Sequence, residues 1–412
     1  MRSEQMPGSS DQPEANPLRR AATGGERREA NSLNRATAGD PGTNGDPKAR
    51  PPSQAARVAP GTAFPQLPAR DLDHILVQTD SLWEDLRGAR LFVTGGSGFF
   101  GRWMLESFVH VNERLGLGAS ALVLSRRPAD FARAAPHLVC RPSIDVMSGD
   151  VRSFDWPAGQ FTHVLHLATQ SEREAGALSP AASHETSVRG TARVLGFAAA
   201  CGAHRLLFTS SGAVYGTQPP ALERLPEDFA GAPDADDPAA GYALGKLEAE
   251  RLCAVAAAES DLQPTVARCF AFVGPGLPLD ANFAVGNFIR DALHGDAIRV
   301  NGDGTPLRSY LYAADLAVWL WTVLLCGVPA RPYNVGSGQA ICIRDLAELV
   351  ARVVGNGTPV IVAKTPAPGV PPARYVPDVS RARAELGVRA SISLDDGLER
   401  TVDWLTGWVR PG

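Results

Sequence analysis

Short apolar runs alternate with longer amphipathic stretches from about residue 71 to the end of the chain. Four of these runs are continuous and bounded by polar or turn-forming residues, at 89–94, 121–125, 163–168 and 205–210. Continuous apolar strands are typical of parallel sheets that helices cover on both faces. The stretches between them, such as 101–115 and 186–201, have the spacing of helices with one apolar face. This alternation predicts an α/β fold with a doubly wound parallel sheet, built from right-handed βαβ units.

Two segments depart from this pattern. Residues 1–68 are rich in Pro, Gly and Arg and poor in large apolar side chains, so they cannot bury enough surface to offset the entropy of ordering. We expect a disordered tail there, and its mixed charges without an apolar stretch resemble neither a secretory signal nor a transit peptide. The longest apolar run, 316–328, is too short to span a bilayer and predicts a buried helix.

Composition narrows the class of protein. The chain has 40 Lys and Arg against 44 Asp and Glu, a net charge of −4, so it lacks the basic excess of a nucleic-acid or anionic-membrane binder. Its six cysteines form no CxxC pair and no metal-ligand spacing, which indicates reduced thiols. We therefore expect a soluble, cytoplasmic globular protein with no metal and no nucleic-acid or membrane partner.

The first predicted strand runs directly into a glycine-rich turn, TGGSGFFGR at 94–102. Such a spacing lets dinucleotide-binding folds turn tightly from strand to helix, admit a pyrophosphate and pack the helix on the sheet. The helix N-terminus also favours an anion through its free N–H groups and its dipole. A turn that binds nothing is the alternative, but its place between strand and helix favours a dinucleotide site. We assign to this site Gly95, Gly98, Phe99, Phe100 and Gly101.

The end of the second strand bears on the choice of cofactor. Ser125 and Arg126 stand where an acid would select NAD, whereas an arginine accommodates the 2′-phosphate of NADP. We therefore favour NADP over NAD, with Arg126 contacting the phosphate and Arg127 as a candidate helper in binding it. The alternative is a pair of solvated arginines in a chain whose basic residues are almost all arginine.

Three further residues fit proton and hydride chemistry. Ser211 follows the fourth strand, and Tyr242 and Lys246 are four residues apart, so they share one face of a predicted helix. A phenol with a pKa of about 10 is a poor base at neutral pH, but an ammonium one turn away stabilises its phenolate. Tyr242 can then exchange a hydroxyl proton while hydride moves to or from nicotinamide. Lys246 would hold the nicotinamide ribose, and Ser211 would orient the reacting oxygen.

A chance Tyr–Lys pair on a solvated helix is the alternative. The chain contains only three lysines, Lys48, Lys246 and Lys364. A lysine at this position by chance is therefore rare, which favours the catalytic interpretation.

These motifs resemble the extended short-chain dehydrogenase/reductases, specifically the sugar-nucleotide epimerase/dehydratase branch. The resemblance spans about residues 88–408 and includes GDV at 149–151, HLAT at 166–169, SSGAVYG at 210–216, YALGK at 242–246, RCFAFVGP at 268–275, GDGTPLRSYLYAADLA at 302–317, YNVGSG at 333–338 and DVSRARAELG at 378–387. It implies a Rossmann domain at 88–270 that binds NAD(P). It also implies a smaller C-terminal α/β lobe at 271–408, with interleaved Rossmann elements, that binds a nucleotide-linked sugar, and assembly as a homodimer.

Carried over position by position, the resemblance implies roles for further residues. Asp150 and Val151 match the adenine contacts, and the stretch that lines the cofactor matches Leu167, Ala168 and Thr169. Arg308 matches an arginine that binds the substrate diphosphate, a role that suits the guanidinium fork; an ordinary surface arginine is the alternative. Asn287 and Arg374 are further candidates for substrate contact, with structural roles as the alternative.

Departures from the family pattern bear on the reaction. In the 4,6-dehydratases the two positions after the catalytic hydroxyl carry acids, and the related decarboxylases keep one in that segment. This chain has Gly212 and Ala213 there, which can neither give nor take a proton, so elimination is disfavoured. Ala271 and Ser187 replace asparagines of the family pattern, so the substrate contacts are altered.

We therefore favour a reductase of a 4-keto (6-deoxy)hexose nucleotide that uses NADPH. A nucleotide-sugar 4-epimerase with recycled cofactor is the main alternative, and a 4,6-dehydratase or decarboxylase is less favoured. A cofactor-binding regulator without turnover is a third class. The sequence leaves open the sugar, the nucleotide base and the stereochemistry.

Overall fold

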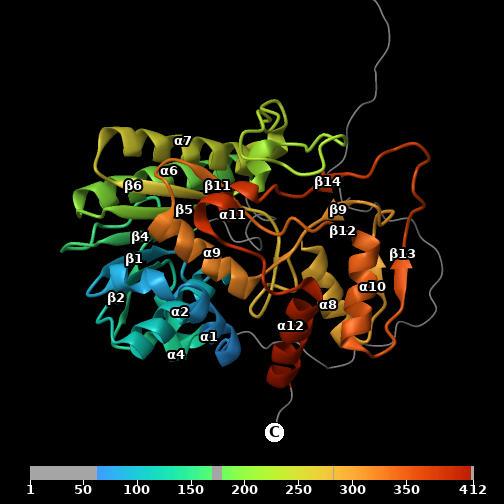
Figure 1. The fold of residues 1–412 in the computed structure, drawn as a ribbon, viewed down its shortest axis with the longest axis horizontal. Helices are drawn as coiled ribbons and strands as arrows, with labels where there is room; N and C mark the ends of the chain where they lie inside the picture. Colours follow the sequence, from blue (N-terminus) through green and yellow to red (C-terminus); the bar gives the residue numbers. More distant parts are fainter. Residues whose placement is uncertain (1–62, 169–178, 282, 410–412) are drawn as a thin grey trace, which may run out of the picture. The chain divides into compact units, whose positions relative to one another are not determined.

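Seven strands form one parallel sheet, which lies in the left half of the view in Figure 1. The structure is a computed structural model that describes residues 63–168, 179–281 and 283–409. The strand order is β11-β6-β5-β4-β1-β2-β3, and every neighbouring pair is parallel. The order runs outward in both directions from β1 and β4, which is the topological switch point of a doubly wound sheet. This confirms the predicted fold class.

The strands of this sheet are β1 (Arg90–Thr94), β2 (Ser120–Ser125), β3 (Ile144–Ser148), β4 (His163–His166), β5 (Arg205–Ser211), β6 (Gln263–Cys269) and β11 (Pro332–Val335). The helices are α1 (Ala69–Gln78), α2 (Phe99–Leu115), α3 (Pro128–Ala134), α4 (Pro136–Val139), α6 (Pro180–Ala200), α7 (Gly241–Glu259), α8 (Ala284–His294), α9 (Ala313–Cys326), α10 (Ile343–Val354), α11 (Ser380–Leu386) and α12 (Leu394–Val409). Short 3-10 turns are η1 (Asp80–Leu86), η2 (Gly212–Tyr215) and η3 (Pro238–Ala240).

Two apolar layers explain why the strands are hydrophobic without interruption. In β1, Leu91 and Val93 belong to a core cluster shared with α2 and α9, whereas Phe92 between them belongs to a second cluster shared with α6 and α7. Successive side chains of a strand point to opposite faces. Each residue of the central strands therefore meets a helical layer on one side or the other.

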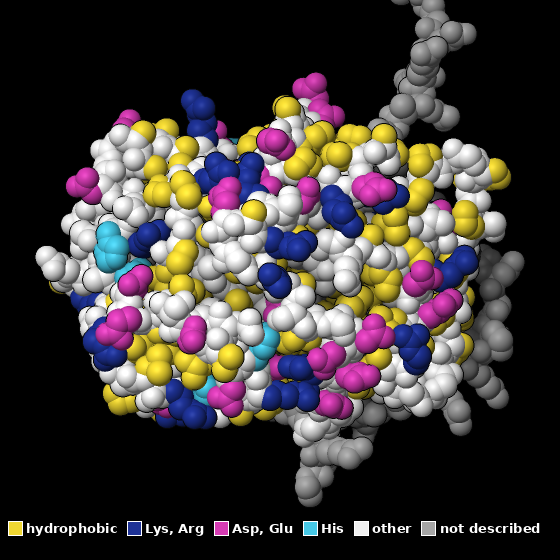
Figure 2. Space-filling view, viewed as in Figure 1, with side chains coloured by type: hydrophobic (Ala, Val, Ile, Leu, Met, Phe, Trp, Pro, Cys, Tyr) yellow, Lys and Arg dark blue, Asp and Glu magenta, His cyan; other side chains and the backbone are white. Residues whose placement is uncertain are grey.

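The predicted buried helix is α9. Every residue from Ala313 to Leu325 is buried, and Trp321 packs edge-on against Trp83 of η1 with ring centroids 5.0 Å apart. Among the described residues, no helix is long and apolar enough to cross a membrane, and no cluster of three His, Cys, Asp or Glu could hold a metal. On the face in Figure 2, basic and acidic side chains are interspersed.

The segment before β1 is part of the body. Within the predicted tail, residues 1–62 lie outside the described residues, but Leu67 is buried and its N–H donates to Glu106 Oε2 at 2.7 Å. Trp404 Nε1 of α12 donates to the carbonyl of Gln66 at 3.0 Å. Residues 63–68 thus connect the first helix to α2 and α12.

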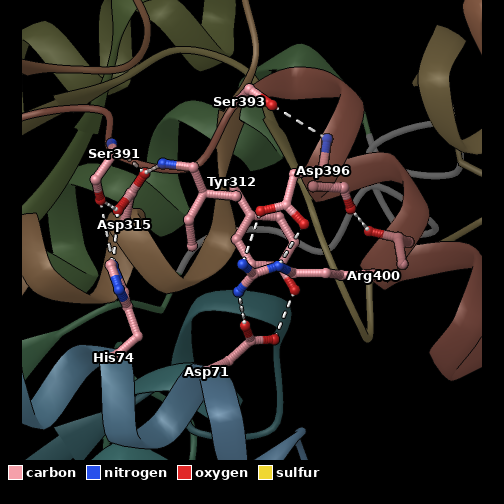
Figure 3. A network of polar contacts seen from close by, with 11 residues as sticks. Asp71, His74, Tyr312, Asp315, Ser391, Ser393, Asp396 and Arg400 are labelled. Atoms are coloured by element: carbon pink, nitrogen blue, oxygen red, sulfur yellow. Dashed lines mark hydrogen bonds and ion pairs between the residues drawn. The ribbon is translucent and has the colours of Figure 1, made fainter.

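A buried polar network joins α1 to α9 and α12 (Figure 3). The fully buried Asp71 accepts hydrogen bonds from Tyr312 at 2.6 Å and from Arg400 at 2.7 Å. Asp315, also buried, accepts from the backbone N–H of Ser391 at 2.8 Å. Because a buried carboxylate is costly unless it is paired, these contacts specify how the N-terminal helix docks.

The C-terminal part adds three small sheets. These are β10-β7 (Leu311–Tyr312 and Phe272–Val273), β12-β9-β14 (Ile341–Cys342, Leu307–Arg308 and Arg374–Tyr375) and β13-β8 (Val360–Val362 and Ile298–Val300). In the second sheet, Tyr375 is in register with Arg308. The sheet therefore brings a segment near the C-terminus next to the predicted diphosphate arginine.

Two buried histidines of β4 make stability depend on pH. Burial lowers the pKa of His163 and of His166 to about 3, from 6.5 in an exposed chain. The unfolded state therefore binds more protons below pH 6.5, and each histidine costs about 2 kcal/mol of unfolding free energy at pH 5 relative to neutral pH. His163→Gln should remove its share of that loss, as measured by urea unfolding at pH 7 and pH 5.

The control is His294→Gln at the end of α8, which removes an imidazole elsewhere. An unchanged pH dependence in His163→Gln would contradict the assignment of a neutral, buried His163.

Candidate active site

The glycine turn after β1 is built by close backbone contacts. Gly95 has φ +75°, and a Cβ there would lie 2.5 Å from the Ala168 nitrogen. A Cβ at Gly101 would lie 2.2 Å from the Gly95 carbonyl oxygen. Only glycine fits either position. The turn is thereby pressed against the end of β4, as a dinucleotide-binding turn requires.

The N-terminus of α2 fits a pyrophosphate. Gly98 is its N-cap, and no side chain caps the first turn. The first N–H groups of a helix have no partners within the helix and favour an anion. The backbone at Phe99, Phe100 and Gly101 could therefore hold the cofactor diphosphate, while the Phe100 ring packs edge-on against Phe272.

Thr94, which the sequence analysis did not assign, connects β1 to the cofactor-lining stretch. Its carbonyl accepts from the Leu167 N–H and its Oγ1 from the Ala168 N–H, both at 3.2 Å. These bonds extend the pairing past the end of β4, where the sequence predicted strand up to residue 168. Thr169 lies outside the described residues.

The residues expected at the adenine end lie at the ends of β2 and β3. Ser125 is buried and its hydroxyl accepts from the Arg127 N–H at 3.2 Å, while the Arg127 side chain lies 3.6 Å from Asp130. Hydrogen bonds from Arg152 lower the pKa of Asp150, and the charge of Arg126 lowers it further. Arg126 is exposed, and its charge acts on Asp150, one of the two predicted adenine contacts. Val151, the other predicted contact, follows Asp150 in the chain.

Ser211 lies at the end of β5, and Tyr242 and Lys246 lie near the start of α7. Ser211 is the last residue of β5, and its hydroxyl accepts from the Ala213 N–H at 3.2 Å. Tyr242 lies in the first turn of α7, with its ring centroid 6.0 Å from Lys246 Nζ. The helical spacing that the sequence predicted therefore brings the phenol and the ammonium together.

Lys246 is a buried cation. Its Nζ donates to the Thr209 carbonyl at 2.8 Å and lies 4.8 Å from the Phe208 ring centroid. Burial lowers the pKa of Lys246 to about 8 and raises that of the adjacent Cys269 thiol to about 12. At pH 7 the site thus contains an ammonium and a neutral thiol.

An ion pair behind Lys246 was not predicted from the sequence. Arg268 of β6 bonds Glu250 of α7, with Nη2 and Oε2 2.7 Å apart, and Ser210 donates to the same carboxylate. The Arg268 guanidinium also lies over the Tyr215 ring, 4.7 Å from its centroid. This pair ties α7 to β5 and β6, and the negative charge of Glu250 favours the protonated form of Lys246.

The candidate substrate residues are divided between one small sheet and one helix. Arg308 on β9 lies 5.9 Å from the Tyr375 ring centroid, and Arg374 precedes that tyrosine on β14. Asn287 lies on α8, where its side-chain oxygen accepts from Arg290 at 3.2 Å. The structure thus brings Arg308 and Arg374 onto one small sheet, whereas Asn287 lies on a separate helix.

Side chains from other segments of the chain occupy the space beside Gly212, the residue after Ser211. A Cβ at Gly212 would lie 2.6 Å from Tyr375 Oη and 2.8 Å from Phe270 Cζ. The Ser211 hydroxyl is also close enough to the Tyr375 phenol to lower its pKa. Tyr375 and Phe270 are therefore site residues that sequence reasoning missed, since no local motif indicated that either would reach Ser211.

Comparisons with known proteins identify the family of this chain. Residues 91–336 match the NAD dependent epimerase/dehydratase family. UDP-glucuronic acid decarboxylase 1 of Xenopus tropicalis is 28% identical over 316 residues, covering 76% of this chain and 72% of that protein. UDP-glucuronic acid decarboxylase 3 of Arabidopsis thaliana is 28% identical over 310 residues, covering 75% of this chain and 86% of that protein.

Solved structures share the fold. UDP-glucose 4-epimerase of Thermotoga maritima has a TM-score of 0.64 at 22% identity, covering 78% of this chain and all of that one. The dTDP-glucose 4,6-dehydratase DesIV of Streptomyces venezuelae, solved with NAD bound, has a TM-score of 0.64 at 24% identity, covering 77% of this chain and 98% of that one. The family match over most of the described body shows that this chain belongs to the NAD dependent epimerase/dehydratase family.

Proposed function

We propose that the protein transfers hydride at a ring carbon of a nucleotide-linked sugar, with reduction of a 4-keto sugar by NADPH as the net reaction. The observation that carries this proposal is the environment of Ser211. Tyr242, in the first turn of α7, offers a phenol beside the Lys246 ammonium, and the space after Ser211 is filled by Tyr375 and Phe270 rather than by an acid. Hydride transfer needs only one such group, whereas loss of water needs a second acid or base.

Each residue of the site has a separate role in the proposed reaction. NADPH, when bound, supplies the hydride. Tyr242 gives its phenolic proton to the carbonyl oxygen, so hydride and proton together convert the ketone to a carbinol. Ser211 donates a hydrogen bond to the same oxygen, and the Lys246 ammonium stabilises the Tyr242 phenolate that is left.

Two features support a nucleotide-linked substrate. Arg308 offers a guanidinium on the small sheet beside Tyr375, and guanidinium groups bind phosphate oxygens in a bidentate manner. The similar proteins are named for UDP- and dTDP-linked sugars. Residence in the cytoplasm and assembly as a homodimer are proposed on the sequence evidence alone.

A 4-epimerase is the second candidate. Epimerisation uses the same Ser211, Tyr242 and Lys246, and proteins named 4-epimerases match the fold over nearly their whole length. A decarboxylase of UDP-glucuronic acid is supported by the names of the curated relatives. Both reactions return the hydride to the sugar, so neither consumes cofactor.

Cofactor release separates these reactions. The purified protein is denatured, and any nucleotide is identified by mass and absorbance. A protein without bound cofactor that oxidises one NADPH per 4-keto sugar is expected for the reductase. Tightly held oxidised cofactor, with turnover of UDP-galactose or UDP-glucuronic acid and no added NADPH, would contradict net reduction.

Tyr242→Phe should lower kcat by a factor of about 100 to 10,000, because it removes the proton donor. Cofactor affinity, measured by fluorescence titration, should change little. A variant that retains the activity of the natural protein would exclude Tyr242 as the acid.

Arg126→Ala should weaken NADPH binding about tenfold or more, the worth of a charge-assisted hydrogen bond, and leave NADH binding unchanged. Arg127→Ala is the matched control, because its guanidinium is directed to Asp130. Equal losses for both cofactors would contradict recognition of the 2′-phosphate by Arg126.

A further inference from the structure

Tyr375 comes to the catalytic residues from the far end of the chain. Strand β14 pairs with β9, which places Tyr375 in register with Arg308. Its ring stacks on Phe270, with centroids 4.7 Å apart and planes 34° apart. Its hydroxyl lies over Gly212, the residue after Ser211, and the Ser211 hydroxyl lowers the pKa of the Tyr375 phenol.

The number of hydrogen bonds that the Ser211 hydroxyl can form determines what the contact with Tyr375 does. A serine hydroxyl has one hydrogen and two acceptor lone pairs. The Ala213 N–H occupies one lone pair at 3.2 Å. If the Tyr375 hydroxyl donates to the other, the single hydrogen of Ser211 is left to point at the substrate oxygen.

We propose that Tyr375 is a positioning residue for Ser211, donating a hydrogen bond that directs the Ser211 proton toward the reacting sugar oxygen. This inference rests on the proposed hydride transfer. Without substrate, the two hydroxyls can exchange donor and acceptor roles, and arrival of the sugar oxygen selects the arrangement in which Tyr375 donates.

The surroundings keep Tyr375 a donor. Burial raises the pKa of its phenol, the Ser211 hydroxyl lowers it in part, and the nearby Tyr242 raises it, because two phenolates would repel each other. Tyr242 is the phenol that lies beside the Lys246 ammonium. One tyrosine therefore exchanges protons with the substrate, and the other stays protonated and orients Ser211.

The same placement explains Gly212. A methyl group there would come within 2.6 Å of the Tyr375 hydroxyl, closer than van der Waals contact permits. The missing side chain of Gly212 thus leaves room for the Tyr375 hydroxyl and for the Phe270 ring, whose Cζ would lie 2.8 Å from a Cβ there.

Kinetics of Tyr375→Phe test the role. This change removes only the hydroxyl, so kcat should fall about tenfold, the worth of one hydrogen bond, with KM nearly unchanged. In a Ser211→Ala background the same change should alter kcat by no more than about twofold, because residues that act through one another are not additive. Tyr333→Phe is the matched control, since its hydroxyl bonds Glu385 instead of a site residue, and it should keep full activity.

Full additivity of Tyr375→Phe with Ser211→Ala would overturn the proposal, because Tyr375 would then act on the substrate directly. A rise in KM alone would overturn it in the same way. An unchanged kcat in Tyr375→Phe would show that the hydroxyl only fills space.

Unfolding measurements test the placement without substrate. Gly212→Ala should lower the urea midpoint of the natural protein, and the loss should be smaller in Tyr375→Phe, where the clashing hydroxyl is gone. An equal loss in both backgrounds would overturn the predicted contact. If the natural protein reduces no nucleotide sugar, the proposed function fails, and this cycle still decides whether Tyr375 lies over Gly212.

Discussion

Burial of the Lys246 ammonium is the constraint on which the rest of the site depends. A cation in a desolvated position is costly unless it is hydrogen-bonded and compensated. The Thr209 carbonyl accepts from it, the Phe208 ring lies beneath it, and the Glu250 carboxylate favours its charge. Glu250 in turn needs Arg268. A positive centre is thereby held beside Tyr242, where a phenolate can form.

Close contacts between backbone segments set the remaining geometry. At the switch point of the sheet, Gly95 and Gly101 allow β1, α2 and the end of β4 to touch, which leaves the N-terminus of α2 for an anion. After β5, Gly212 leaves room for the Tyr375 hydroxyl, which β14 brings next to Ser211. In the proposed reaction, the cofactor site and the sugar site would thus both depend on positions where a side chain is missing.

Local patterns in the sequence were sufficient for the fold and for part of the site. The apolar strands and the buried helix α9 could be predicted, and so could the glycine turn and the Tyr242–Lys246 spacing, because each depends on neighbours along the chain. Tyr375 and Phe270 could not, because their contact with Ser211 depends on how β14 pairs with β9. The Arg268–Glu250 pair depends in the same way on the packing of β6 against α7.

Transfer of deuterium from labelled cofactor tests the central claim most directly. Protein freed of bound nucleotide is mixed with NADPH that carries deuterium at the transferred position and with a nucleotide-linked 4-keto-6-deoxyhexose. The account predicts one deuterium at C4 of the carbinol product, detected by mass spectrometry and NMR. Product without deuterium, or no product from any nucleotide-linked ketone, would contradict hydride transfer at this site.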